Sequence, residues 1–427
     1  MNLTQRRKGA KGKKQILCIF APSRKVLFVC LIVLLLPAIV NAQDSAVPVD
    51  GAPFRAKLVA ADANWRLTFA DGDVQKTMLA ADLVRWGNCA EQGRGGFAVF
   101  TDGSLLATEV VSADKDRITL DGDSFGTEKL PLESLAGVVF HSPSDHQRRD
   151  ALQDRLLRDS GDADRAILDN GDEITGLVEG ISADAVTIKT AARRTAIQLD
   201  RVAAILFNPS LRQKPAAKKN AMHAWVGLAD GSRLLASQLI FSGNSLEVTV
   251  AGQTLKMSPK QLVFLQPLGG RSIYLSDQKP AAYRQTPYLN LAWPYGSDCS
   301  VTGGMLRVGD QLFIKGIGVH SAARLGYDLS PLPLGEGQGV RAAIRFDALA
   351  CIDDSAAGQG SVVFRVLVDG HERFASKTIR GGDRPVPISV DLRGAKRLEL
   401  VVDWADRADV LDHADWLDAR VTLTPSP

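Results

Sequence analysis

Cysteine is scarce in this chain, which has five cysteines in 427 residues. Cys18 and Cys30 lie near the amino terminus, so Cys89, Cys299 and Cys351 remain for the rest of the protein. Three cysteines permit one intramolecular bridge at most, which excludes a small fold held together by disulfides. Two interpretations stay open for the last two cysteines, a bridge between them or burial as small apolar side chains.

The chain also lacks a charge excess of one sign. Its formal net charge is +3, but residues 1–42 hold eight basic residues and no acidic one. In the remainder, 43 basic residues face 48 acidic ones, so that part is mildly acidic. This balance gives no general attraction for phosphate backbones or anionic membranes, and we expect no nucleic-acid partner.

Sequence motifs of common enzyme classes are missing as well. Residues 50–268 show no glycine-rich phosphate loop, no metal-ligand cluster and no nucleophile elbow. The last third has no helical periodicity longer than two turns, which argues against a barrel of alternating strands and helices. We therefore predict no catalytic residues and no enzyme activity.

One long apolar run is present, and it lies near the amino terminus. Basic residues precede the run Val26–Val40, and Val40-Asn41-Ala42 matches the small-residue pattern after which signal peptidase cleaves. This predicts a signal peptide over 1–42 and a location outside the cytoplasm, in the periplasm, at the cell surface or secreted. The alternative is an uncleaved anchor, the one arrangement in which we expect contact with a membrane.

The middle of the chain repeats one pattern four times. Each copy runs through a polar turn, alternating strands and a closing apolar strand, over 53–86, 97–140, 165–207 and 225–264. Three copies carry Asp-Gly or Asn-Gly at the same place, which suits a tight hairpin. Units of about 40 residues are too small to bury a large core alone, so we expect them to pair into small antiparallel barrels or sandwiches.

These patterns divide the chain into modules. We predict a β module with two repeats over 50–145, a connecting helix over 146–160, a second β module with two repeats over 161–268, and a last domain over 271–427. Within the second module, residues 210–222 form a basic linker, read either as a solvated loop or as a patch for anionic polysaccharide or phosphate.

Strand patterns dominate the last domain too. Alternating or apolar runs lie between Gly, Pro and Asp turns, at 340–349, 360–370, 385–394, 396–405 and 418–424. This pattern is typical of a β-sandwich. The predicted fold class of the whole chain is therefore all-β.

Three strings in the last domain carry a family resemblance: YLSD (Tyr274–Asp277), KGIGVHS (Lys315–Ser321) and DHADWLDAR (Asp412–Arg420). With them, residues from about 271 to 424 resemble the novel putative carbohydrate-binding module family, NPCBM, which is often appended to glycoside hydrolases. The resemblance implies a galactose-binding-like jelly-roll sandwich. It also implies a glycan or polysaccharide partner, so we expect a secreted or envelope-located protein that holds a galactose-like or related sugar.

Sugar binding requires a flat apolar surface and hydrogen-bonding groups that pair with hydroxyls. The residues that offer these groups near the family strings are His320, Asp412, His413, Asp415, Trp416, Trp293 and Tyr295. Three alternatives stay open. His320 serves equally well to cap a strand end, and Trp416 to fill the core. Asp412 and Asp415 serve equally well to satisfy backbone amides, to anchor Arg420 or to hold calcium.

Two further functions compete with glycan binding. One is a structural or adhesive envelope protein, whose sandwich binds a protein partner through its aromatic loop. A glycoside hydrolase within 50–268 is the other, but hydrolysis needs two carboxylates placed across a cleft, and the acidic residues there are scattered.

Overall fold

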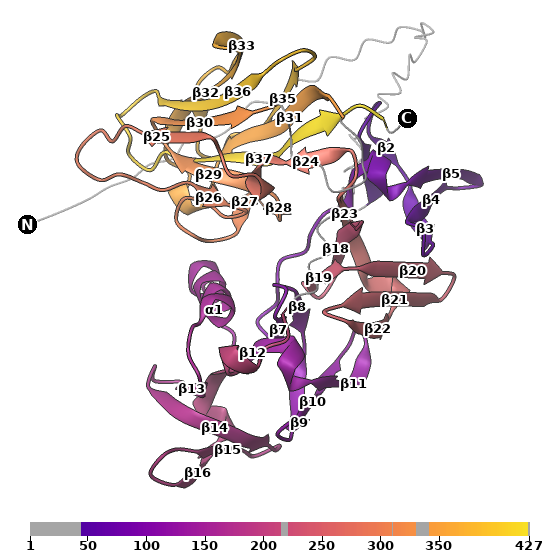
Figure 1. Cartoon of the computed structure of the whole chain (residues 1–427), viewed down its shortest axis with the longest axis vertical. Helices are drawn as coiled ribbons and strands as arrows, with labels where there is room; N and C mark the ends of the chain where they lie inside the picture. Colours follow the sequence, from indigo (N-terminus) through magenta and orange to yellow (C-terminus); the bar gives the residue numbers. More distant parts are fainter. Residues whose placement is uncertain (1–43, 215–220, 310, 330–340, 426–427) are drawn as a thin grey trace, which may run out of the picture. The chain divides into compact units, whose positions relative to one another are not determined.

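The computed structural model describes residues 44–214, 221–309, 311–329 and 341–425. The expected signal peptide over 1–42 and part of the basic linker, 215–220, lie outside the described residues. The described chain is built of antiparallel sheets, and α1 (His146–Arg158) is its one α-helix (Figure 1). The prediction of an all-β fold is confirmed. No helix of the described residues has the length and apolar character needed to cross a membrane.

The four sequence repeats form four β units with one order of elements, in which short strands lead to a 3-10 turn and a closing strand. The first unit, after β1 (Ser45–Pro48), contains β2 (Phe54–Arg55), β3 (Lys57–Ala61), β4 (Arg66–Asp71), β5 (Val74–Leu79) and β6 (Leu83–Gly87). The second contains β7 (Phe97–Phe100), β8 (Leu105–Ala107), β9 (Glu109–Ala113), β10 (Arg117–Gly122), β11 (Gly126–Pro131) and β12 (Leu135–Val139). The third contains β13 (Asp164–Leu168), β14 (Glu173–Ile181), β15 (Ala185–Lys189), β16 (Arg194–Gln198) and β17 (Val202–Leu206). The fourth contains β18 (His223–Leu228), β19 (Arg233–Ala236), β20 (Gln238–Ser242), β21 (Ser245–Val250), β22 (Gln253–Met257) and β23 (Leu262–Leu268).

The repeated dipeptides form the turns that the sequence predicts. Asp102, Asn170 and Asp230 each accept a hydrogen bond from the backbone N–H two residues later, at 2.8–3.0 Å. The glycine that follows each of them has a positive φ, which glycine adopts without steric cost. Between the turns, alternate side chains such as Ile118 and Leu120 are buried, because successive residues of a strand point to opposite faces.

The units do not pair as the predicted modules 50–145 and 161–268 require. The second unit joins the third through β12–β17 and β9–β14, whereas the first joins the fourth through β3–β20 and β6–β23. Each closing strand pairs on one edge with the opening strand of its unit, as β1 does with β6 and β7 with β12. Its other edge pairs with the closing strand of a different unit, β12 with β17 and β6 with β23. The buried residues of all four units form one hydrophobic core.

The last domain is a sandwich of two antiparallel sheets. One sheet has the order β26 (Gly296–Ser297), β29 (Gly316–His320), β37 (His413–Leu423), β31 (Ala343–Ile352) and β35 (Val386–Asp391), with β24 (Ser272–Tyr274) also paired to β37. The other has the order β25 (Ala282–Gln285), β30 (Ala323–Asp328), β36 (Arg397–Trp404), β32 (Ser361–Val368) and β33 (His371–Ala375), with β34 (Ile379–Arg380) paired to β32. A separate hairpin, β27 (Leu306–Val308) and β28 (Gln311–Phe313), packs against β31 and β37.

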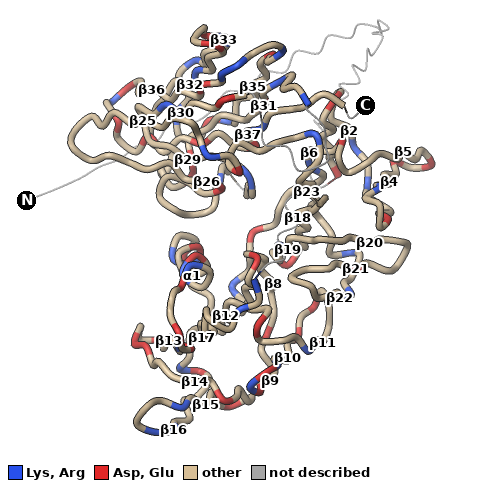
Figure 2. Tube along the Cα trace, viewed as in Figure 1, with Lys and Arg blue, Asp and Glu red and all other residues tan. Residues whose placement is uncertain are grey.

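The core of the sandwich lies between its two sheets. The inward side chains of β29, β31 and β37 pack there against those of β30, β32 and β36. Basic and acidic residues are interspersed along both sheets and along the β units (Figure 2). The connections β25–β26, β29–β30, β31–β32 and β36–β37 leave the sheets near one end of the sandwich, which contains most of the predicted site residues.

Candidate functional site

Three aromatic rings come together at this end of the sandwich. The indole of Trp293 stacks on the imidazole of His320, with ring centroids 4.9 Å apart and an interplanar angle of 5°. The ring of His413 lies 6.2 Å from Trp293 and 5.9 Å from His320. The two histidines are 4% and 5% exposed, and Trp293, which covers them, is half-buried. The structure thus brings together three of the predicted site residues.

Neighbouring strands place the two histidines side by side. His320 ends β29 and His413 begins β37, and they are register partners in this antiparallel pair. Alternation turns Ile317 and Val319 into the core and His320 toward the other face of the sheet. A Cβ atom on Gly318 would lie 2.5 Å from the Cys299 carbonyl oxygen, so that glycine allows the chain to pass close over β29.

One nitrogen of each imidazole is held by the protein. Nδ1 of His320 donates to the Ser321 carbonyl at 3.0 Å, and Nδ1 of His413 shares a hydrogen bond of 2.9 Å with the Ser355 hydroxyl. Within the described residues, neither Nε2 has a hydrogen-bond partner, and neither is among the polar atoms sealed from solvent. These two nitrogens are therefore the groups available to a ligand hydroxyl.

Burial and the nearby His320 lower the pKa of His413, while Asp353 acts in the opposite direction. His413 is consequently neutral at neutral pH. A neutral imidazole has one ring nitrogen that donates and one that accepts. A sugar hydroxyl both donates and accepts hydrogen bonds, so the neutral His413 ring suits an uncharged ligand that is rich in hydroxyls.

Asp412 lies beneath the rings and joins the two sheets. One carboxylate oxygen accepts from the Ser321 hydroxyl at 2.6 Å and the other from the Ser361 backbone N–H at 2.8 Å. Its side chain is fully buried, and burial raises its pKa despite these two hydrogen bonds. The prediction that Asp412 faces a sugar does not fit this position, because its oxygens already hold the ends of β30 and β32.

Trp416 is a core residue. Its side chain is fully buried and packs edge-to-face against Phe364 and Phe346, with centroids 4.8 and 6.1 Å away. The prediction that it presents a face to a sugar is corrected by its position. Ala414 and Trp416 occupy alternate positions of β37 that point between the sheets, whereas His413 points away from them.

Asp415 is also fully buried, so it does not face a ligand as predicted. No described residue hydrogen-bonds to either of its carboxyl oxygens. Burial, and then the nearby charge of Asp353, raise its pKa well above the ordinary value. Asp353 itself accepts from the backbone N–H groups of Ser355 and Arg307, at 2.9 Å each.

Tyr295 supports the loop that holds Trp293. Its half-buried ring packs edge-to-face on Tyr283 at 5.0 Å, and the Tyr283 hydroxyl donates to the Trp293 carbonyl at 2.7 Å. Gln285 adds a second connection, accepting from the Trp293 N–H at 3.2 Å and donating to the Ser321 carbonyl at 3.0 Å. These contacts fix the backbone of Trp293 over the histidines.

Two exposed aromatic residues at the same end are not among the predicted site residues. Tyr288 and Trp404 are 56% and 38% exposed and lie edge-to-face at 5.8 Å. Trp404 follows Leu398, Leu400 and Val402 in strand alternation, so it has the same strand phase as these core residues. That it extends beyond the core is visible only once the length of the facing strands is known.

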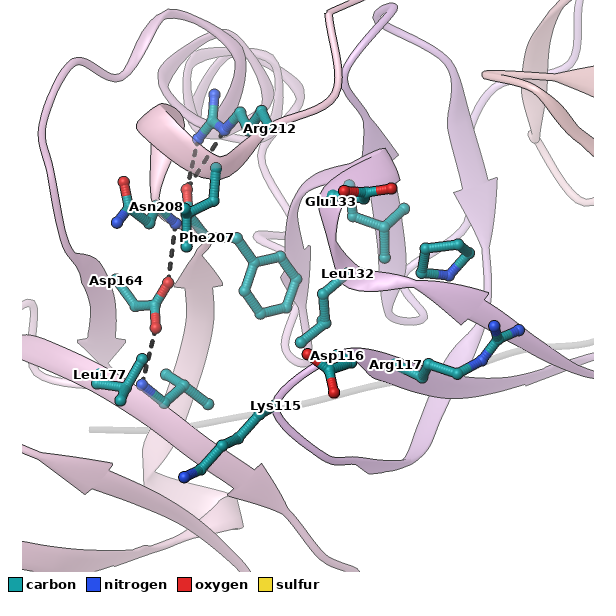
Figure 3. A pocket seen from close by; sticks show the side chains of 14 residues that line it. Lys115, Asp116, Arg117, Leu132, Glu133, Asp164, Leu177, Phe207, Asn208 and Arg212 are labelled. Carbon is teal, nitrogen blue, oxygen red and sulfur yellow. Dashed lines mark hydrogen bonds between the residues drawn. The ribbon is translucent and has the colours of Figure 1, made fainter.

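A separate pocket of about 570 Å³ lies between the second and third β units (Figure 3). Its buried carboxylate, Asp164, accepts from the backbone N–H groups of Val178 and Asn208 at 2.7 and 2.8 Å. Its Arg212 donates to the backbone carbonyls of Phe207, Ala136 and Leu157. Both groups thus stabilise the fold, and the pocket presents a mainly apolar floor.

Metal and thiol chemistry receive little support from the described residues. No group of three or more His, Cys, Asp and Glu side chains there is arranged to hold a metal ion. Cys89, Cys299 and Cys351 are free thiols, so the Cys299–Cys351 bridge is not formed.

Comparison with known proteins identifies the last domain. Residues 271–422 match the model of the NPCBM/NEW2 domain. "Alpha-1,3-galactosidase B" of Akkermansia muciniphila is 32% identical over 131 residues, which cover 30% of this chain and 15% of that protein. A "putative endo-alpha-N-acetylgalactosaminidase" of Renibacterium salmoninarum is 30% identical over 125 residues, covering 29% and 8%. The matched stretches are therefore small parts of both relatives.

Two solved structures from Clostridium perfringens are similar to part of the chain. The CBM51 of a GH95 protein, in complex with methyl-galactose, is 24% identical and covers 35% of this chain and 99% of its own, with a TM-score of 0.31. A structure of CBM51-2 in complex with GlcNAc and INT domains, from ZmpB, is 27% identical and covers 43% and 37%, with a TM-score of 0.31. Together with the three family strings and the two-sheet sandwich, the family match leads to one conclusion: residues 271–422 form an NPCBM/NEW2 domain.

Proposed function

We propose that this chain is an extracytoplasmic, non-catalytic carbohydrate-binding protein. Its last domain holds a glycan at the surface formed by Trp293, His320 and His413, and the β units act as a spacer. The observation that carries the proposal is this ring cluster, with two unpaired Nε2 atoms, within a domain that matches NPCBM/NEW2. The match supports a carbohydrate-binding module.

The chemistry of the surface suits a sugar. The exposed part of the indole offers an apolar plane to the C–H groups of a pyranose, and the imidazoles offer hydrogen bonds to its hydroxyls. Neither histidine lines the pocket of about 570 Å³ between the second and third β units or the pocket of about 580 Å³ beside Cys299. A shallow site buries little of a sugar and exchanges water hydrogen bonds for protein ones at small gain, so a single site binds weakly.

Galactose is the first sugar to test. The name of the Akkermansia relative refers to a galactosidase, and this chain matches only a small part of that protein. Specificity for galactose is therefore part of the proposal. N-acetylglucosamine, glucose and mannose complete the panel.

The test is a titration of the full chain with each monosaccharide, by calorimetry or nuclear magnetic resonance, in calcium and in EDTA. We expect millimolar binding of one sugar, weakened at least tenfold by His413→Ala. His371→Ala is the matched control, because His371 is an exposed histidine on β33, outside the ring cluster. The sugar affinity of the His371→Ala variant should equal that of the wild type.

The proposal fails if no saccharide binds the full chain at all. It also fails in its site assignment if a sugar binds and neither His413→Ala nor Trp293→Ala weakens it. Recovery of one dominant envelope protein in a pull-down, without sugar binding, would instead favour the adhesive function.

A further inference from the structure

One loop crosses the end of the sandwich from sheet to sheet. Residues 286–295 connect β25, at the edge of one sheet, with β26, at the edge of the other (Figure 1). Near its end the loop places Trp293 on His320, and near its beginning it places Tyr288 against Trp404. The same loop therefore has an aromatic contact with each of the two sheets.

The second contact lies where the core ends. Leu398, Leu400 and Val402 of β36 are fully buried, and Trp404 has the same strand phase but is 38% exposed. Its indole continues the inner face of the sheet beyond the last core residue. Trp404 belongs to one sheet and His413 to the other, and both lie at the same end of the sandwich.

Strand pairing and hydrogen bonds connect the two aromatic contacts. Trp404 pairs in register with Val362, and the preceding residue, Ser361, donates its N–H to Asp412 at 2.8 Å. Asp412 also binds the Ser321 hydroxyl at 2.6 Å, next to His320. The surface between Trp404 and the histidines is therefore supported by one continuous buried network.

The Tyr288–Trp404 pair has free ring faces. The rings meet at 89° with centroids 5.8 Å apart. In such an edge-to-face pair, the ring that points its edge keeps both faces uncovered by its partner, and the other ring keeps one. The exposed ion pair of Arg380 and Asp406, at 2.5 Å, supplies hydroxyl-binding groups nearby, since Asp406 bonds to Ser361.

We propose that Tyr288 and Trp404 form a second saccharide subsite, so that this domain selects oligosaccharides over monosaccharides. The inference rests on the proposed function, in which the first sugar occupies the Trp293–His320–His413 surface. A sugar ring stacked on the aromatic pair adds affinity without any movement of the first ring. An aromatic contact of this kind corresponds to about a tenfold gain at most.

The experiment compares the full chain with galactose, α-1,3-galactobiose and N-acetyllactosamine. We expect at least one disaccharide to bind the wild type about tenfold more tightly than galactose. In Trp404→Ala and in Tyr288→Ala, this ratio of affinities falls to about one. Val74→Ala is the control, because it truncates an exposed apolar side chain of the first β unit, and its ratio stays at the wild-type value.

Tyr288→Ala protects the test against misfolding, because Tyr288 lies outside every strand. A wild-type ratio near one, or a ratio that both variants leave unchanged, overturns the second subsite while the proposed function stands. Absence of binding to all three sugars overturns both. Leu289 and Leu291 are exposed in the same loop, so capture of a protein that only Tyr288→Ala abolishes would also overturn the saccharide assignment.

Discussion

Strand alternation along β37 determines what each residue of the DHADW string does. Ala414 and Trp416 enter the core, whereas His413 and Asp415 lie on the opposite face of the sheet. The sequence identifies these residue types but leaves open which of them reach solvent. Only His413 combines an unpaired ring nitrogen with a position at the end of the strand, where β37 begins.

Asp415 makes stability depend on pH. Burial raises its pKa in the folded protein above that in the unfolded chain, which is about 4. Above that pH the folded state holds a proton that the unfolded state has lost. The contribution of Asp415 is therefore fully present below about pH 4 and is lost as the pH rises toward the folded pKa.

We expect Asp415→Asn to be more stable than the wild type at pH 7 and nearly equal to it at pH 4. The amide has nearly the same shape, cannot ionise, and retains an N–H donor toward Asp353. Urea unfolding at several pH values between 4 and 8 measures the difference. Parallel stability curves for the two proteins would contradict the assignment, and Asp391→Asn, at an exposed carboxylate, serves as the control.

At the scale of elements, the three family strings are joined to each other by side chains. Lys315 of KGIGVHS forms ion pairs with Asp277 of YLSD at 2.5 Å and with Asp298 at 2.6 Å. Ser321 of KGIGVHS binds Asp412 of DHADW at 2.6 Å. Side-chain contacts thus hold the second string to the first and to the third.

Glycine in β29 serves close packing. Gly316 and Gly318 both lie within β29 rather than in a turn. At Gly318, a Cβ atom would lie 2.5 Å from the Cys299 carbonyl oxygen and 2.6 Å from the Ser300 Cα. These backbone atoms cannot move away from an added Cβ as the end of a flexible side chain can.

We therefore expect Gly318→Ala to destabilise the protein by about 1–3 kcal/mol, as overpacking does. It should also weaken sugar binding, because the displaced segment leads to Trp293. Thermal unfolding and the monosaccharide titration measure the two effects. Gly95→Ala is the control, since nothing lies within 4 Å of its added Cβ. Equal stability of the two variants would refute the packing argument.

At the scale of the whole molecule, one arginine connects the sandwich with the β units. Arg307 of β27 binds Asp150 of α1 at 2.5 Å and Glu91 at 3.1 Å. Burial opposes ionisation of Glu91, yet the hydrogen bond and charge of Arg307 prevail, and lower its pKa to about 2. Glu91 therefore stabilises the fold above about pH 4.5, and this contribution is lost as the pH falls toward 2.

We expect Arg307→Met to cost about 3–5 kcal/mol at pH 7, because it leaves Asp150 without its charge partner in a buried position. The cost should shrink as the pH falls below 4.5, where Glu91 takes up a proton in the variant. Arg393→Met, which breaks an exposed pair with Asp391, should change stability by less than about 1 kcal/mol. Denaturant unfolding at pH 3 and pH 7 measures the stability of both variants. An equal loss of stability in Arg307→Met and Arg393→Met would contradict the role of this network.

A second contact between the β units and the sandwich lies beside the short connection from β23 to β24. Gln266 of the last β unit donates to the Tyr274 hydroxyl and to Asp418 of the sandwich, at 2.9 Å each. These three side chains are buried together. The sandwich uses this neighbour to satisfy its own polar groups, which is why the experiments above use the full chain.

The sequence by itself determined the properties that depend on local pattern. Period-two alternation, turn dipeptides and the three family strings are local, and they indicated the all-β class, the four repeated units and the NPCBM/NEW2 domain. The tertiary structure decided how the units pair and which residues of the last domain face a ligand. Pairing of the units depends on which strand edges are left open, and this is not visible in any one repeat. Exposure depends on where facing strands end, so the sequence around Trp404 or Trp416 does not show which of them reaches solvent.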